Sequence, residues 1–136
     1  MDQHDAILSR LLTLHPKRID LSLGRITRLL EALGRPDTKL PPIIHVAGTN
    51  GKGSTSHMLA AILQQEGYKT GLYTSPHIKA FGERIRINGE MIDPQFVIDF
   101  TLKTKELCNE IEPSFFELTV AMAFCYFAEN NVDIAV

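Results

Sequence analysis

The sequence has few features of secreted, membrane-spanning or nucleic-acid-binding proteins. Its two cysteines, Cys108 and Cys125, form no C-x-x-C pair, so neither a disulfide framework nor a zinc site is predicted. The net charge of -2, without a basic stripe, gives no support for a nucleic-acid partner. No apolar run is long enough for a membrane span, and residues 1–5 are acidic and polar where a secretory leader would be basic. We therefore expect a cytoplasmic protein without a membrane or nucleic-acid partner.

The chain has the size and composition of one compact α/β unit, with 136 residues of which 44% are hydrophobic. Residues 43–47 are a short β-branched run that is typical of a buried parallel strand. From Ser54 onward, apolar residues recur at helical spacing. A glycine-rich stretch with one lysine, Lys52, connects the two. This order of elements predicts a strand, a turn and a helix.

Such a turn predicts a phosphate-binding loop. The free amides and the positive dipole end of the first helical turn favour an anion, and glycines let the backbone approach it closely. Lys52 would add charge for the terminal phosphates, and Ser54 or Thr55 could offer a hydroxyl to Mg²⁺. The residues predicted to bind phosphate groups are Gly48, Thr49, Asn50, Gly51, Lys52, Gly53, Ser54 and Thr55.

The loop departs from the general Walker pattern, because Val46 stands at the first glycine and Gly53 follows the lysine. Its glycines also run in the reverse spacing of the dinucleotide fingerprint, which disfavours a Rossmann NAD site. The alternative interpretation is a glycine-rich turn with a solvated lysine.

Residues 68–74 are predicted to form a second strand, parallel to the first, after a helix that ends at Gly67. This arrangement would place Gly48 and Ser75 on one edge of the sheet, and His45 is expected to be packed in the core. The helix after the loop should be buried. Further helices are expected over 6–16, 22–34, 93–112 and 114–129, with a hairpin over 83–92 and a strand from 132.

Three motifs together resemble a known family. They are G-T-N-G-K-G-S at 48–54, T-S-P-H at 74–77 and E-R-I-R-I-N-G at 83–89. In this order they closely resemble folylpolyglutamate synthase and its bifunctional form with dihydrofolate synthase, which are Mur-ligase-like ATP-dependent amide ligases. The family's loop has the same two departures from the Walker pattern. The resemblance runs from residue 19 to residue 136.

The resemblance implies a Mur-ligase-like central ATPase domain. Residues 1–136 would be the N-terminal part of this ATP-binding domain, truncated after the start of a third core strand, with the C-terminal domain absent. The resemblance also implies that Ser75 gives an oxygen to Mg²⁺, and that Asp20, Ser22, Phe116 and Glu117 lie beside the pterin-bearing substrate. From the residues alone, Ser75, Asp20 and Ser22 are turn or capping residues, and Glu117 has capping-box spacing to Ser114.

The implied reaction is the ATP- and Mg²⁺-dependent addition of L-glutamate to a folate or dihydropteroate carboxylate, by a parent enzyme that is a monomer. The chain alone is expected to be inactive, and its uncovered apolar surface is expected to favour self-association. Two alternatives share the loop: a P-loop kinase or NTPase, and a non-catalytic nucleotide-binding module.

Overall fold

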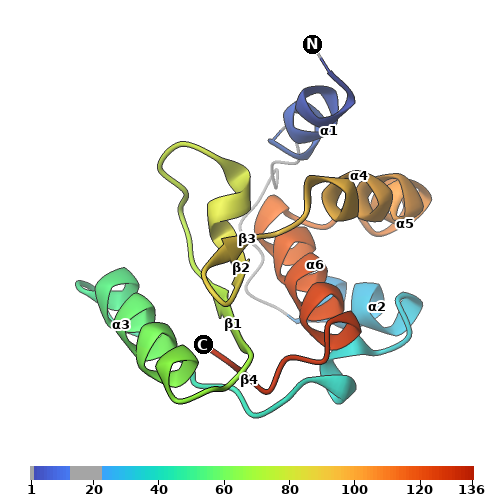
Figure 1. The fold of residues 1–136 in the computed structure, drawn as a ribbon. Coiled ribbons are helices and arrows are strands. Elements are labelled where there is room, and N and C mark those ends of the chain that lie inside the picture. The colour runs from blue at the N-terminus through green and yellow to red at the C-terminus, as the bar shows by residue number, and fades with distance from the viewer. Residues whose placement is uncertain (1, 13–22) are drawn as a thin grey trace. The chain divides into compact units, whose positions relative to one another are not determined.

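The computed structural model describes residues 2–12 and 23–136 (Figure 1). The chain divides into two compact units, one made of Met1–Thr38 and Pro94–Cys125 and the other of Lys39–Asp93 and Tyr126–Val136. We call them the helical unit and the sheet unit and describe each by itself. The α/β class predicted from the sequence is confirmed.

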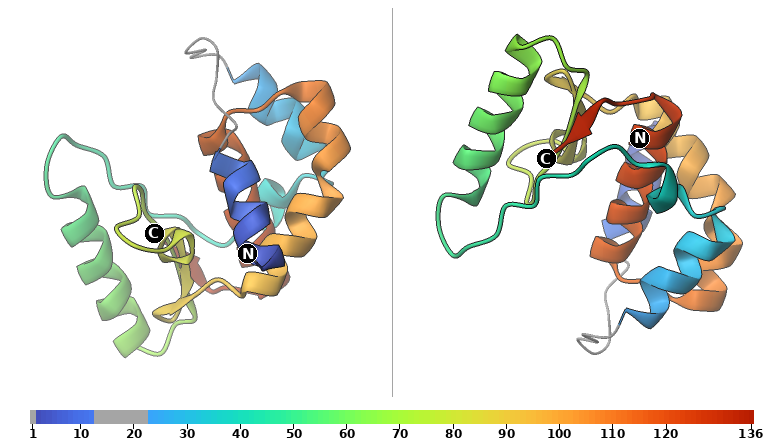
Figure 2. Two further views of the ribbon diagram at one scale, coloured as in Figure 1. Left: turned by 90° about the horizontal axis from the view of Figure 1, so that it is seen from above. Right: turned by 90° about the horizontal axis from the view of Figure 1, so that it is seen from below.

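The helical unit consists of helices that pack around apolar faces, and both views of Figure 2 show them side by side. They are α1 (Gln3–Leu12), α2 (Gly24–Ala32), α4 (Pro94–Lys103), α5 (Lys105–Ile111) and most of α6 (Phe115–Glu129), with a 3-10 turn η1 (Pro36–Lys39) after α2. The buried apolar side chains of this unit are Ile7, Leu11, Leu29, Leu30, Val97, Ile98, Phe100, Ile111, Leu118, Ala121, Met122 and Ala123. Burial of the apolar run in α6 is therefore confirmed.

The single helix predicted over 93–112 is wrong, because α4 and α5 are separated at Thr104, whose ψ is 3°. The buried Thr104 hydroxyl donates to the Phe100 carbonyl oxygen at 2.8 Å. A threonine that bonds to the previous turn competes with the backbone ladder and bends the helix there. Apolar periodicity does not report such a bend.

The sheet unit holds four described strands in the order β3-β2-β1-β4. They are β1 (Thr70–Tyr73), β2 (Ile85–Ile87), β3 (Glu90–Met91) and β4 (Ile134–Ala135). The β1 and β4 strands are parallel, whereas β1, β2 and β3 pair antiparallel. The sheet is thus mixed, because the predicted hairpin joins it through β2. Its turn has φ values of 49° at Asn88 and 80° at Gly89, as a two-residue hairpin turn requires.

The strand predicted over 43–47 is reduced to one parallel bridge between Ile43 and Ala135. The Ile44 amide donates to the Ala135 carbonyl oxygen at 2.8 Å, and β4 reaches no further along this segment. Residues beyond Ile44 therefore lack a strand partner within the described part of the chain. His45 is consequently exposed, and its predicted place in the core is wrong.

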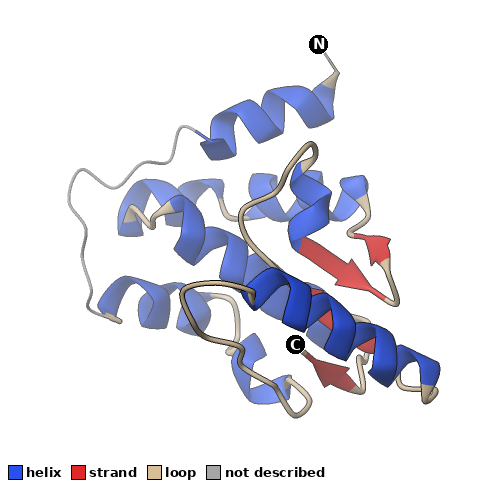
Figure 3. Cartoon of the chain, turned by 90° about the vertical axis from the view of Figure 1, so that its left-hand side faces the viewer, coloured by secondary structure: helices blue, strands red, loops and turns tan. Residues whose placement is uncertain are grey.

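Helix α3 (Lys52–Gln65) follows the glycine-rich stretch at residues 48–51, which we call the glycine loop. It packs against β1 and crosses one face of the sheet in Figure 3. It ends before Gly67, whose φ of 94° is typical of a glycine that terminates a helix. The predicted burial of α3 is wrong: Met58 is 59% exposed and Ile62 is 60% exposed. The apolar face of α3 thus extends beyond the part that β1 covers.

Gly71 in β1 leaves no room for a side chain, because a Cβ built there would lie 2.9 Å from the Phe127 ring. Gly71→Ala should lower the free energy of unfolding by about 1 to 2 kcal/mol, since the buried ring must move. Urea denaturation of both proteins measures this change. Gly53→Ala is the matched control, because nothing lies within 4 Å of its added methyl group. Equal losses in both variants would contradict the packing explanation.

Candidate functional site

The glycine loop opens onto the N-terminus of α3. Gly51 is the residue before the helix and has φ 77° and ψ 5°, a left-handed conformation that glycine adopts without strain. Helical hydrogen bonding starts at Thr55, whose amide donates to the Gly51 carbonyl oxygen at 3.0 Å. Amides before that position have no helical acceptor, and residues 47–55 are exposed. The backbone therefore presents free donors and a positive dipole end to solvent.

Lys52 folds back over this loop. Its Nζ donates to the carbonyl oxygen of Gly48 and lies 3.4 Å from that of Thr49. The ammonium group is thus held beside the donors of the first helical turn. Both acceptors are neutral carbonyls, so a phosphate oxygen would be a stronger partner for the same group. The predicted pairing of Lys52 with an anion fits this geometry.

The hydroxyl residues of the first turn differ in their surroundings. Ser54 and Thr55 are exposed, whereas Ser56 is buried and its hydroxyl donates to the Lys52 carbonyl oxygen at 2.7 Å. Ser56 therefore supports the helix, and Ser54 and Thr55 remain accessible to a ligand.

Ser75 lies two residues after the end of β1 and is exposed. The Ile43 bridge, β4 and β1 all run in the same direction, so the chain segments that lead to Gly48 and to Ser75 leave the sheet at the same edge. Parallel α/β sheets bind ligands at this edge. Ser75 thus leaves the sheet at the predicted edge, although β4 lies between β1 and the strand segment at Ile43 that leads to the loop.

The segment after Ser75 is held by a group that we did not predict from the sequence. The Glu83 carboxylate accepts hydrogen bonds from the amides of Ile78, Lys79 and Ala80 at 3.0, 2.9 and 2.8 Å. These bonds, with that from Ile78 contributing most, lower the pKa of Glu83 to about 2. The group is charged at neutral pH, and the bonds weaken only as the pH falls below 4.5 toward 2. The sequence carried no signal for this role, because Ala80, three residues before Glu83, has no side-chain acceptor that could complete a capping box.

The other predicted substrate residues lie in the helical unit or outside the described residues. Asp20 and Ser22 lie outside the described residues. Phe116 is 58% exposed on α6. Glu117 forms the predicted capping box, because its Oε1 accepts from the Ser114 amide at 2.9 Å and its own amide donates to the Ser114 hydroxyl at 3.1 Å. Arg25 Nε lies 3.0 Å from the same Oε1 as an ion pair, although its N–H does not point at that oxygen.

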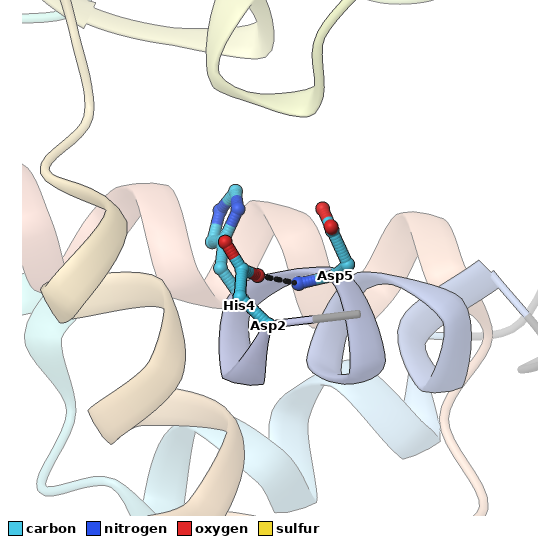
Figure 4. A group of neighbouring side chains, drawn as sticks. All are labelled: Asp2, His4 and Asp5. Carbon is cyan, nitrogen blue, oxygen red and sulfur yellow. Dashed lines mark hydrogen bonds between the residues drawn. The ribbon is translucent and has the colours of Figure 1, made fainter.

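A separate group of side chains occurs at the start of α1, where Asp2, His4 and Asp5 lie with ligand atoms within 4.8 Å of one another (Figure 4). Asp2 Oδ1 accepts a hydrogen bond from the Asp5 amide at 2.8 Å, as helix-capping side chains do. The two carboxylates are exposed. Capping accounts for the position of Asp2, and the group was not predicted as a site.

The sequence predicts neither a disulfide framework nor a membrane-spanning helix. Neither Cys108 nor Cys125 forms a disulfide within the described part of the chain. Over residues 2–12 and 23–136, none of the helices combines the length and the apolar character that crossing a membrane requires.

Comparison with known proteins identifies relatives along the whole chain, although no family model matches it. The dihydrofolate synthase/folylpolyglutamate synthase of Bacillus subtilis is 40% identical over 124 residues, covering 84% of this chain and 28% of the relative. The folylpolyglutamate synthase of Thermotoga maritima has 44% identity and a TM-score of 0.86, covering 99% of this chain and 33% of that structure.

A further solved structure is a complex of folylpolyglutamate synthase with AMPPCP and folate. It has 33% identity and a TM-score of 0.88, and the match covers 98% of this chain and 34% of that one. The chain therefore spans about a third of the length of the relatives that it matches.

Proposed function

Since the chain is homologous, over nearly all of its length, to one part of the folylpolyglutamate synthase and dihydrofolate synthase ligases, we propose that its glycine loop binds ATP for ligation. The observation that carries the proposal is the exposed loop at the N-terminus of α3, with the Lys52 ammonium beside free backbone amides. The AMPPCP complex of a relative supports it, because AMPPCP is an ATP analogue. Residues 48–55 would hold the phosphates.

The proposed reaction has two steps. A carboxylate oxygen of folate or dihydropteroate attacks the γ-phosphorus of ATP, which releases ADP and leaves an acyl phosphate. The amine of L-glutamate then attacks the acyl carbon, phosphate leaves with the electrons of the C–O bond, and the amine loses a proton as the amide forms. A free carboxylate would have to expel oxide, so phosphorylation supplies the leaving group. The loop's contribution is positioning and charge neutralisation.

Mg²⁺ would neutralise phosphate charge in this site. The donor set fits a hard cation, because the exposed Ser75, Ser54 and Thr55 hydroxyls are oxygen ligands and Mg²⁺ keeps much of its water. We propose Ser75 as the protein ligand, since it leaves the sheet at the same edge as Gly48. We do not propose Glu83 for this role, because its carboxylate already accepts three backbone amides.

The remaining partners are proposals that follow from the homology. Folate or dihydropteroate would contact Phe116, Glu117, Asp20 and Ser22, and the parent enzyme would act as a monomer in the cytoplasm without nucleic acid. Two cysteines outside any disulfide are compatible with a reducing compartment. Four exposed apolar side chains of the sheet unit support self-association of the chain studied alone. They are Ile43, Met58, Ile62 and Tyr68.

Titration of AMPPCP into the 136-residue chain tests the site. Binding should be saturable, and Mg²⁺ should tighten it relative to EDTA. Ser75→Ala should reduce that Mg²⁺-dependent gain by about 2- to 12-fold, the equivalent of one hydrogen-bond-strength contact, and leave the affinity in EDTA unchanged. Ser9→Ala is the control, because Ser9 is exposed on α1 of the helical unit. An unaltered Mg²⁺ dependence in Ser75→Ala would make Ser75 a turn residue only.

A further inference from the structure

The loop that carries Ser75 has little apolar contact to hold it. Ile78 is 90% exposed, and Lys79 and Ala80 are exposed as well. Burial therefore cannot fix the backbone of this segment. Its three consecutive amides instead converge on one carboxylate, that of Glu83, at 2.8 to 3.0 Å. Hydrogen bonds to a charged acceptor are stronger than those between neutral groups.

The turn that contains Glu83 also holds the other end of the loop. This turn is the 3-10 segment η2 (Phe81–Arg84), anchored by Phe81, which is 4% exposed. Arg84 Nε donates to His77 Nδ1 at 2.7 Å, and the Arg84 carbonyl oxygen accepts from the Thr74 amide at 2.9 Å. Bonds to η2 thus flank Ser75 on both sides along the chain. Since β2 begins directly at Ile85, the turn is fixed to the sheet.

We propose that Glu83 is a positioning residue of the nucleotide site, whose carboxylate fixes residues 78–80 so that the Ser75 hydroxyl is presented to the metal of a bound Mg²⁺–nucleotide. This inference rests on the proposed function. Glu83 touches neither metal nor nucleotide in it. Its effect comes from lowering the number of conformations that the Ser75 loop can adopt before binding, which reduces the entropic cost of ordering that loop.

Glu83→Gln is the test, because glutamine has nearly the same shape but presents an amide NH₂ donor in place of one acceptor oxygen. Hydrogen exchange at the amides of Ile78, Lys79 and Ala80 should be at least 10-fold faster in the variant. The Mg²⁺-dependent gain in AMPPCP affinity should fall as it does in Ser75→Ala, while the affinity in EDTA should not change. Glu90→Gln is the matched control, because Glu90 is exposed in β3.

Glu83→Asp keeps the charge with a shorter reach and should give intermediate values in both measurements. Faster exchange at 78–80 with an unchanged Mg²⁺ dependence would overturn the positioning role, although Glu83 would still be shown to hold the loop. Unchanged exchange would show that the three hydrogen bonds to Glu83 do not hold residues 78–80. Wild-type protein that binds AMPPCP equally with and without Mg²⁺ would refute the proposed metal site, and the exchange data would still report on the loop. Equal melting temperatures of the variants exclude unfolding as the cause.

Discussion

Lys52→Ala should weaken AMPPCP binding to the 136-residue chain by about 10- to 150-fold, the effect of losing charge-assisted contacts worth about 1.5 to 3 kcal/mol. Among the described residues, the partners of the Lys52 ammonium are the loop carbonyls of Gly48 and Thr49, and Lys52 is exposed. Removing it therefore leaves the backbone donors in place but without the adjacent positive charge. Isothermal titration in Mg²⁺ gives the two affinities.

The same substitution should leave the melting temperature nearly unchanged, because no buried group loses a partner. Lys105→Ala serves as the control for a general loss of positive charge, since Lys105 is an exposed residue at the start of α5. Its affinity should equal that of the wild type. Equal AMPPCP affinity in Lys52→Ala and wild type would remove the glycine loop from the proposed site.

Glu117→Ala should lower the free energy of unfolding by about 2 to 4 kcal/mol. The loss has two sources: the capping bonds at Ser114, and an Arg25 side chain that is only 23% exposed and would lose its ion-pair partner. Urea denaturation measures the sum. Glu110→Ala is the matched control, because Glu110 is exposed on α5 and should change stability little.

Glu117→Gln separates the two sources, because glutamine also completes a capping box but carries no charge. Its smaller loss would measure the ion pair with Arg25. A Glu117→Ala protein as stable as the Glu110→Ala protein would show that the carboxylate contributes little to the fold. In that case, Glu117 would be free to serve the substrate role proposed for it.

Local patterns in the sequence predicted those features whose causes lie within a few residues. The loop before α3, the terminating Gly67 and the turn at Asn88 and Gly89 all depend on backbone conformations that their own residues favour. The capping box between Ser114 and Glu117 belongs to the same class. Each could be located by residue type and spacing alone.

Features that depend on distant partners could not be predicted. The length of the strand at Ile43 is set by β4, whose Ala135 lies 92 positions later in the chain. The exposure of Met58 depends on what covers α3, which helical spacing cannot show. Glu83 was assigned to a hairpin strand because charged and apolar residues alternate there. In the structure its carboxylate accepts hydrogen bonds from three amides, which depends on how the loop folds back.

The folded-back position of Lys52 also bears on how quickly a nucleotide could bind to the glycine loop. The first turn of α3 and the left-handed Gly51 are already formed, so the donors need no rearrangement of the main chain. Only the lysine side chain must leave its carbonyl acceptors, and rotations of an exposed side chain take picoseconds to nanoseconds. Such motions are far faster than the encounter of a protein with a dilute nucleotide. We therefore expect nucleotide association at this loop to be governed by diffusion and charge, and differences in affinity to come mainly from the lifetime of the complex.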